Sequence, residues 1–249
     1  MRMKVVILVI GALLAAASLS ALTMDELDVN LGLIHIGTTD PAAQGPSIIT
    51  PLFGVSLPLG LGGPFFLEPM LEFYTTYYLW TGTAVAPAAL ETGGNAFLAL
   101  GTLISLHGGL RYAVSPAITL GGSVGVDFLL RFPIEFLSND PNRSADTGSA
   151  LSYFFGMARF FYPETRLFLK WQLTNPVGLV VSLRAWYPLF HLWDGQNLPF
   201  LDQFMFSGGI GIAIRLGPAP AAPASAPSAE ALTTTPTTAL PSTPAPATR

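Results

Sequence analysis

The 249-residue chain contains no cysteine and few charged residues. Without thiols it has no disulfide framework, thiolate metal site, cysteine nucleophile or lipid anchor on an N-terminal cysteine. Charged residues make up 10% of the chain, less than half of the roughly 25% of a soluble globular domain. This shortage argues against a cytosolic domain. It also argues against a nucleic-acid partner, which needs a face rich in Lys and Arg. The composition favours a membrane or secreted protein.

Residues 1–21 have the layout of a secretory signal peptide. Arg2 and Lys4 precede an apolar run, Val5–Leu14, and small residues follow up to Ala21. We expect cleavage near Ser20 or Ala21. An uncleaved anchor helix is the alternative, because the apolar run is marginally long enough to span a bilayer.

Residues 217–249 are rich in proline, alanine and threonine and carry only two charged side chains. Such a segment cannot bury enough apolar surface to offset the entropy lost on ordering. We therefore expect a disordered tail with polyproline II character, on the periplasmic side of a membrane.

Residues 22–216 contain no further apolar run of 20 residues, so the sequence does not support other transmembrane helices. Apolar and polar residues instead alternate with period two, most clearly in Ile118–Phe132. The alternation predicts eight strands, at residues 27–37, 48–59, 65–79, 97–114, 118–132, 166–173, 178–187 and 204–216.

Short and long connections alternate between these strands. The short ones are residues 60–64, 115–117 and 174–177, and the long ones are residues 38–47, 80–96, 133–165 and 188–203. This order is typical of an all-β, up-and-down, eight-stranded antiparallel transmembrane β-barrel with tight periplasmic turns. An even number of strands leaves both termini in the periplasm.

Residues 149–163 leave the strand count open. The spacing of Leu151, Phe154 and Ala158 favours a short amphipathic helix in the third long connection. A strand here is the alternative, and it would lead to a ten-stranded barrel.

Ten charged residues occur in the predicted strands, each on the face opposite the apolar side of its own strand. An arginine or lysine facing lipid at mid-bilayer costs about 2–4 kcal/mol, so we expect these charges inside the barrel. They are Asp28, Glu68, Glu72, Arg111, Asp127, Arg131, Arg166, Lys170, Arg184 and Arg215.

Four aromatic residues lie on the apolar faces close to strand ends. Tyr112 and Trp171 are next to short turns, and Tyr77 and Tyr187 are near long connections. Amphipathic rings favour the two membrane interfaces, so we predict this location for all four.

Parts of the chain resemble the small eight-stranded outer-membrane barrels of Gram-negative-type bacteria. These parts are two hairpins, at residues 109–128 and 168–187, and the last predicted strand. In the last strand, Ser207, Gly209, Ile212 and Ile214 occupy the positions of such a barrel's assembly signal. The resemblance implies a bacterial outer-membrane location, with outer-membrane lipid and the barrel-assembly machinery as partners.

Two short segments, residues 183–190 and 204–207, also resemble the OmpW-like subfamily. That resemblance implies uptake of small hydrophobic molecules.

An eight-stranded barrel has room for side chains or for one small ligand. A small channel or transporter for small solutes, hydrophobic or amphiphilic ones among them, is the leading expectation. The predicted lumen has more cations than carboxylates, which would favour anions. Bulky residues near the long connections predict an apolar vestibule: Tyr74, Tyr78, Trp80, Leu129 and Trp186.

A closed lumen is the main alternative. Salt bridges of Glu68 and Glu72 with Arg111 and Arg131 would fill it. The protein would then be a structural or adhesion-type barrel that binds host or surface ligands through its long connections.

A lipid-modifying enzyme is the third hypothesis, because Ser105, His107 and Asp127 share one face of two neighbouring strands. We expect no enzymatic activity, since such trios arise easily by chance. The histidines head no recognisable metal-ligand spacing, so we expect neither a metal nor a cofactor.

Overall fold

The computed structural model describes residues 22–24, 26–38, 48–82, 84–88, 96–134, 143–195, 199 and 201–216. The predicted signal peptide (1–21) and tail (217–249) lie outside the described residues, as do parts of all four long connections.

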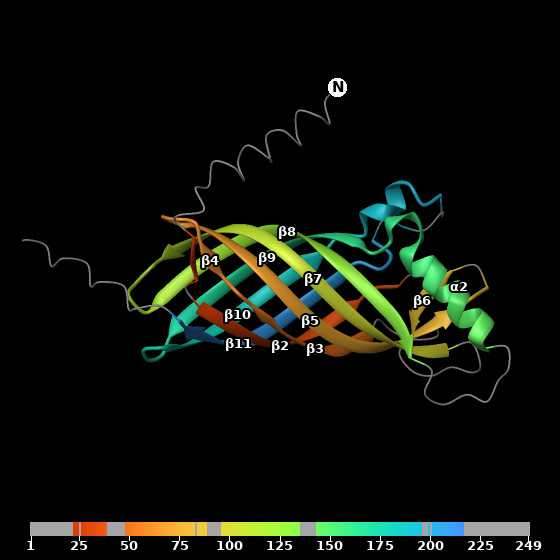
Figure 1. The fold of residues 1–249 in the computed structure, drawn as a ribbon, viewed down its shortest axis with the longest axis horizontal. Coiled ribbons are helices and arrows are strands. Elements are labelled where there is room, and N and C mark those ends of the chain that lie inside the picture. Colours follow the sequence, from red (N-terminus) through yellow and green to blue (C-terminus); the bar gives the residue numbers. More distant parts are fainter. Residues whose placement is uncertain are drawn as a thin grey trace, which may run out of the picture. The chain divides into compact units, whose positions relative to one another are not determined.

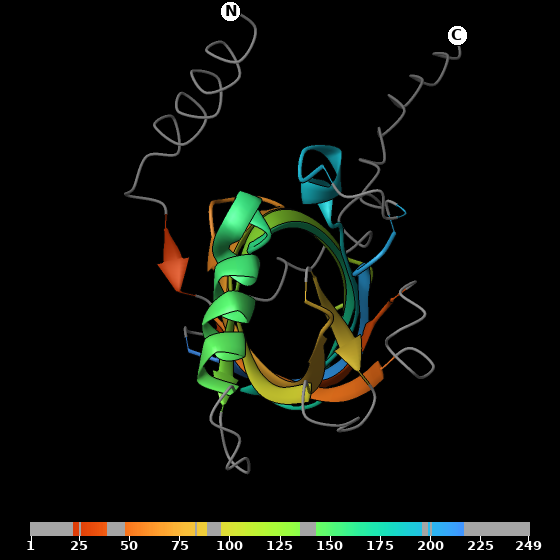
Figure 2. The ribbon, with the colours of Figure 1, turned by 90° about the vertical axis from the view of Figure 1, so that its right-hand side faces the viewer.

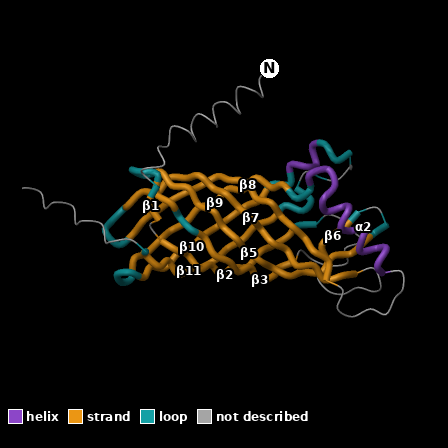
Figure 3. Tube along the Cα trace, viewed as in Figure 1, coloured by secondary structure: helices purple, strands orange, loops and turns teal. Residues whose placement is uncertain are grey.

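Eight long strands form a closed antiparallel barrel (Figure 1, Figure 3). Each strand pairs with the next long strand along the chain, and the last pairs with the first, which closes the ring. The strands are β2 Glu26–Ile36, β3 Ile48–Ser56, β5 Phe65–Trp80, β7 Ala96–Ala113, β8 Ile118–Ile134, β9 Phe161–Gln172, β10 Val177–Trp186 and β11 Met205–Arg215.

Smaller elements lie at the two ends of the barrel. At the end with the short turns, β1 (Thr23–Met24) pairs with β4 (Leu59–Gly60). At the end with the long connections, β6 (Val85–Ala88) pairs with the last residues of β5. Helix α2 (Arg143–Phe155), followed by the 3-10 turn η3 (Gly156–Ala158), runs along one side of this mouth (Figure 2). A second 3-10 turn, η4, covers Leu189–Leu192.

Within the described ranges, no helix has the length and apolarity needed to cross a membrane.

The eight predicted strands are confirmed, most of them to within two residues at each end. One prediction was too long: the strand at 48–59 stops at Ser56 and resumes only as β4. Pro58 lies in the gap, and it has no N–H to continue the ladder. The strand prediction did not include β6, whose four residues contain a proline.

The predicted helix at 149–163 is displaced. Helix α2 begins earlier, at Arg143, and ends at Phe155, while β9 begins at Phe161 instead of residue 166. Pairing with β8 accounts for the change. The Leu129 N–H donates to the Phe160 carbonyl at 2.7 Å, and Phe128 lies opposite Phe161. Tertiary pairing therefore overrides the local helical spacing.

The two faces of the strands differ as the alternation predicts. Apolar side chains on the outer face are widely exposed, for example Leu31 at 58%, Val124 at 65% and Leu167 at 66%. The Asp, Glu, Lys and Arg side chains of the eight long strands all lie at inward positions of the alternation. An apolar exterior around an ionised interior suits a lipid environment.

Candidate functional site in the barrel lumen

Arg184 is the centre of the lumen's ion-pair network. Its Nε and Nη2 donate to the two carboxylate oxygens of Glu164 at 2.6 and 2.9 Å. Its Nη1 donates to Glu72, which comes from β5. All three side chains are at most 4% exposed. One guanidinium therefore neutralises two carboxylates and links strands that are not neighbours in the barrel.

Two further ion pairs lie on the short-turn side of this network. Arg166 Nη1 donates to Glu68 Oε2 at 2.6 Å. Lys170 Nζ pairs with Glu26 and lies 3.7 Å from Asp28 Oδ2. Arg184, Arg166 and Lys170 are thus each paired with buried carboxylates, which is how proteins hold ions away from water.

His107 joins two carboxylates beside Arg184. Its Nε2 lies 3.0 Å from Glu164 Oε2 and 3.7 Å from Asp127 Oδ1. His107 on β7 and Glu164 on β9 both lie opposite Gly125 of β8, which is between them. A Cβ at Gly125 would lie 1.9 Å from His107 Cδ2, so the missing side chain lets the two groups meet.

The same packing of a large side chain over an inward glycine recurs elsewhere in the lumen. The ring of Tyr74 covers Gly101, and the ring of Phe168 covers Gly121; a Cβ at either glycine would lie 2.2 Å from ring atoms. Small and large residues facing each other across strands fill a narrow barrel without voids.

Aromatic side chains close the lumen at the long-connection end. We call the group formed by Tyr74, Tyr78, Phe154, Tyr162, Trp186 and Phe190 the aromatic cap; each member is at most 1% exposed. Arg131 lies within the cap, with its guanidinium carbon 4.2 Å from the centre of the Phe154 ring. Its Nη2 donates to the Arg159 carbonyl at 2.8 Å.

The predicted apolar vestibule is therefore wrong. Four of its five residues are fully buried in packed clusters, and the fifth, Trp80, packs against the cluster that contains Tyr78. A cavity lined by Asn30, Met70, Glu72, Arg166 and Arg184, among others, has room for about one water molecule.

The structure brings all ten predicted lumen charges inside, but it corrects two inferences drawn from them. Glu68 pairs with Arg166 and Glu72 with Arg184, whereas Arg131 contacts the aromatic cap. Arg111 and Arg215 lie half-buried nearer the short turns, and Arg215 Nη2 donates to Gln172 Oε1 at 3.1 Å.

The second correction concerns the charge balance. The lumen also contains Glu26 and Glu164, which were not among the predicted lumen charges. Glu26 precedes the predicted first strand, and Glu164 was placed in a loop. With them, six carboxylates face six Arg and Lys side chains in the described strands. Within these strands, therefore, the predicted excess of cations is absent.

The trio considered for lipid chemistry does not form a linked set in the described structure. The Ser105 hydroxyl lies opposite Asp127 but makes no hydrogen bond with the described residues, including His107.

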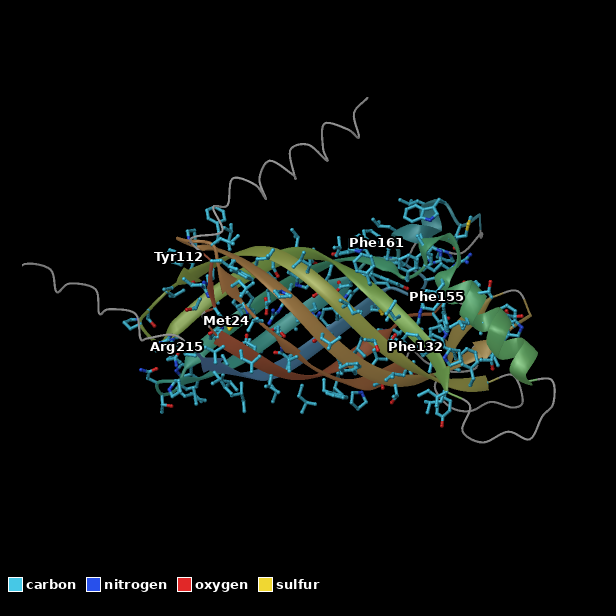
Figure 4. The ribbon with its side chains drawn as sticks, in the orientation of Figure 1. Met24, Tyr112, Phe132, Phe155, Phe161 and Arg215 are labelled. Carbon is cyan, nitrogen blue, oxygen red and sulfur yellow. The ribbon has the colours of Figure 1, made fainter. Side chains whose placement is uncertain are left out.

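The predicted interface aromatics occupy the outer face of the barrel. Tyr112 and Trp171 are 73% and 51% exposed, and Tyr112 projects at the short-turn end (Figure 4). Tyr77 and Tyr187 are half-buried near the long connections. Phe132, Phe155 and Phe161 lie at that end too (Figure 4). They belong to a chain of ring contacts that was not predicted from the sequence.

The residues of the predicted assembly signal all lie on β11. Ser207 is buried in the lumen, Gly209 lies opposite Gly32, and Ile212 and Ile214 are exposed on the outer face. Their role in assembly stays a prediction.

A closed antiparallel barrel with a charge-free exterior and a polar lumen defines a transmembrane β-barrel of the outer-membrane type. No protein-family model and no curated protein matches the chain.

Solved outer-membrane barrels are similar to it. Neisserial surface protein A is 6% identical, with a TM-score of 0.49, over 78% of this chain and 98% of that one. OprG of Pseudomonas aeruginosa is 11% identical (TM-score 0.44; 77% and 97% covered). The Yersinia pestis attachment invasion locus protein Ail, in complex with the heparin analogue sucrose octasulfate, is 8% identical (TM-score 0.42; 78% and 99% covered).

Proposed function

We propose that the protein is a bacterial outer-membrane barrel with a closed lumen, and that it acts through its long-connection end as a structural or surface-interaction protein. In this proposal the long connections face outward and both termini face the periplasm. The observation that carries the proposal is the filling of the lumen by the aromatic cap and the ion-pair network.

Opening the lumen would require several buried interactions to break together. A solute would have to displace Arg184 from two carboxylates and separate the rings of the aromatic cap. Removing one partner from a buried ion pair costs about 3–5 kcal/mol. A channel for small solutes, the leading expectation from the sequence, would therefore need a second conformation of the barrel.

The long-connection end exposes apolar side chains that a partner could contact. Leu192 is 69% exposed, Met157 53% and Trp193 45%. The Trp193 indole N–H donates to the Met157 carbonyl at 2.7 Å, which joins η3 to η4. We call these three residues the apolar rim. Exposed apolar residues gathered at one place are typical of interaction sites.

Liposome swelling tests the closed lumen. Purified protein is folded into liposomes, folding is verified by heat-modifiable migration, and swelling is followed in solutions of small sugars and amino acids. We expect the rate of protein-free liposomes. Swelling that rises with the amount of folded protein would refute the closed lumen and support the channel.

Adhesion of whole cells to octyl-coated beads tests the proposed surface role. We expect that cells displaying the protein bind more beads than cells without it, and that Leu192→Ser with Trp193→Ser removes the difference. Arg215→Met, a lumen substitution at the opposite end, is the matched control and should not reduce binding. Equal binding by the rim variant and the wild type would contradict the proposed role of the apolar rim.

A further inference from the structure

His107, Asp127 and Glu164 form a compact group of metal-ligand atoms deep in the lumen. One ligand atom from each residue lies within 4.8 Å of the other two, and all three side chains are at most 1% exposed. The residues come from three adjacent strands, β7, β8 and β9, so the barrel itself fixes their positions. We propose that this group is a binding site for one divalent transition-metal ion, Zn²⁺ being the best match.

The unsatisfied polar atoms of the group point to a missing ligand. Neither oxygen of Asp127 receives a hydrogen bond from the described residues, although its side chain is fully buried. A buried carboxylate that receives no hydrogen bond costs several kcal/mol. The hydroxyl of Ser105, directly across from Asp127, is also buried without a described partner. A bound cation, with water at its open position, would supply partners to both.

The local charge balance also favours a cation. Around the site, four carboxylates face two guanidinium groups: Glu68, Glu72, Asp127 and Glu164 against Arg166 and Arg184. With a neutral His107, the described charges sum to −2. One divalent ion would neutralise this excess, and a single proton on His107 would neutralise only half of it.

The donor set selects the metal. An imidazole nitrogen with two carboxylate oxygens suits Zn²⁺, which binds these atoms at about 2.0–2.2 Å. Ligand atoms around such an ion are about 3–4 Å apart. The observed separations of 3.0 Å (His107 to Glu164) and 3.7 Å (His107 to Asp127) fall in that range.

Arg184 would serve as the outer partner of the site. It already donates to both oxygens of Glu164, and metal-binding carboxylates are themselves usually hydrogen-bonded. Each carboxylate oxygen has two lone pairs, so Glu164 Oε2 can accept from Arg184 and still bind a cation. Gly125 provides the space, since a Cβ there would collide with the His107 ring.

Metal content after refolding tests the proposal. The site is buried, so the chain is folded from denaturant into detergent with either one equivalent of zinc sulfate or EDTA. Free metal is removed by gel filtration, and zinc per folded barrel is counted by mass spectrometry. We expect about one Zn²⁺ per wild-type barrel folded with zinc. Asp127→Asn should reduce zinc binding at least about tenfold.

Asp28→Asn is the matched control, because Asp28 is another buried lumen carboxylate with an unpaired oxygen but lies outside the group. It should bind as much zinc as the wild type. If Asp127→Asn does not fold, His107→Gln replaces it with the same expected loss. Absence of zinc from the folded wild type, or equal zinc in wild type and variant, would overturn the proposal. A protonated His107 between two carboxylates would then explain the group.

Discussion

Replacing Arg184 tests how strongly the ion-pair network holds the barrel together. Arg184→Met keeps a long apolar side chain but leaves Glu72 and Glu164 without their guanidinium. Removing one partner of a buried ion pair costs about 3–5 kcal/mol. Arg184 donates two hydrogen bonds to Glu164, of 2.6 and 2.9 Å, and a third to Glu72. Because its loss leaves two buried carboxylates unpaired, we expect the free energy of unfolding to fall by about 5 kcal/mol.

Equilibrium unfolding in urea, in detergent micelles, measures this loss. Tryptophan fluorescence is a direct probe, since the Trp186 ring lies 4.5 Å from the guanidinium carbon of Arg184. Adding Glu72→Gln and Glu164→Gln to Arg184→Met should recover at least about half of the loss, because the uncompensated charges are gone.

Arg215→Met is the matched control for that experiment. Arg215 is half-buried, and the hydrogen bond described for its side chain is to the neutral amide of Gln172, so we expect a cost of about 1 kcal/mol. A loss below about 1 kcal/mol for Arg184→Met, or the same loss as for Arg215→Met, would refute the reasoning. It would mean that water reaches the network and screens its charges.

Three further changes probe other parts of the barrel. Val124 lies on the outer face, level with the ion-pair network. Val124→Arg should therefore destabilise the barrel in lipid by about 2–4 kcal/mol, measured by urea titration. Ile118→Arg, at a strand end, should cost about 1 kcal/mol or less in the same titration. Equal costs would contradict a lipid-facing surface. Gly101→Ala would place a Cβ 2.2 Å from the Tyr74 ring and should cost about 1–3 kcal/mol; an unchanged urea midpoint would show that the ring can move away freely. Phe154→Ala should remove about 3 kcal/mol of packing between α2 and the barrel, seen as faster protease cleavage between β8 and β9, and unchanged cleavage would mean that α2 is held by other contacts.

The strand pattern could be predicted because apolar and polar residues alternate along each strand, and the apolar positions mark the face toward lipid. In Ile118–Ile134 the alternation alone separates Asp127 and Arg131 from the exposed Val124 and Phe128. The even number of strands and the order of short and long connections then determine the barrel. The start of β9 at Phe161 could not be predicted in the same way, because it depends on pairing with β8.

The contents of the lumen were predictable, but the contacts between them were not. Ten inward charges could be identified from their position opposite the apolar face. Their partners depend on the register of several strands at once, as when Arg184 of β10 meets Glu72 of β5, 112 residues earlier. Glu164 was missed because helical spacing upstream concealed the start of β9. Gly125 lets His107 approach Glu164, but nothing in the sequence of its own strand indicates this role, which depends on the neighbouring strands.

Conductance across a planar lipid bilayer tests the central claim, the closed lumen, most directly. Folded protein, verified by heat-modifiable migration, is inserted and recorded over a wide range of voltages in concentrated potassium chloride. We predict no conductance above that of the bare bilayer. Reproducible conductance steps in the wild type, with a size that changes in Arg184→Met, would contradict the account and show that ions pass through the charged lumen.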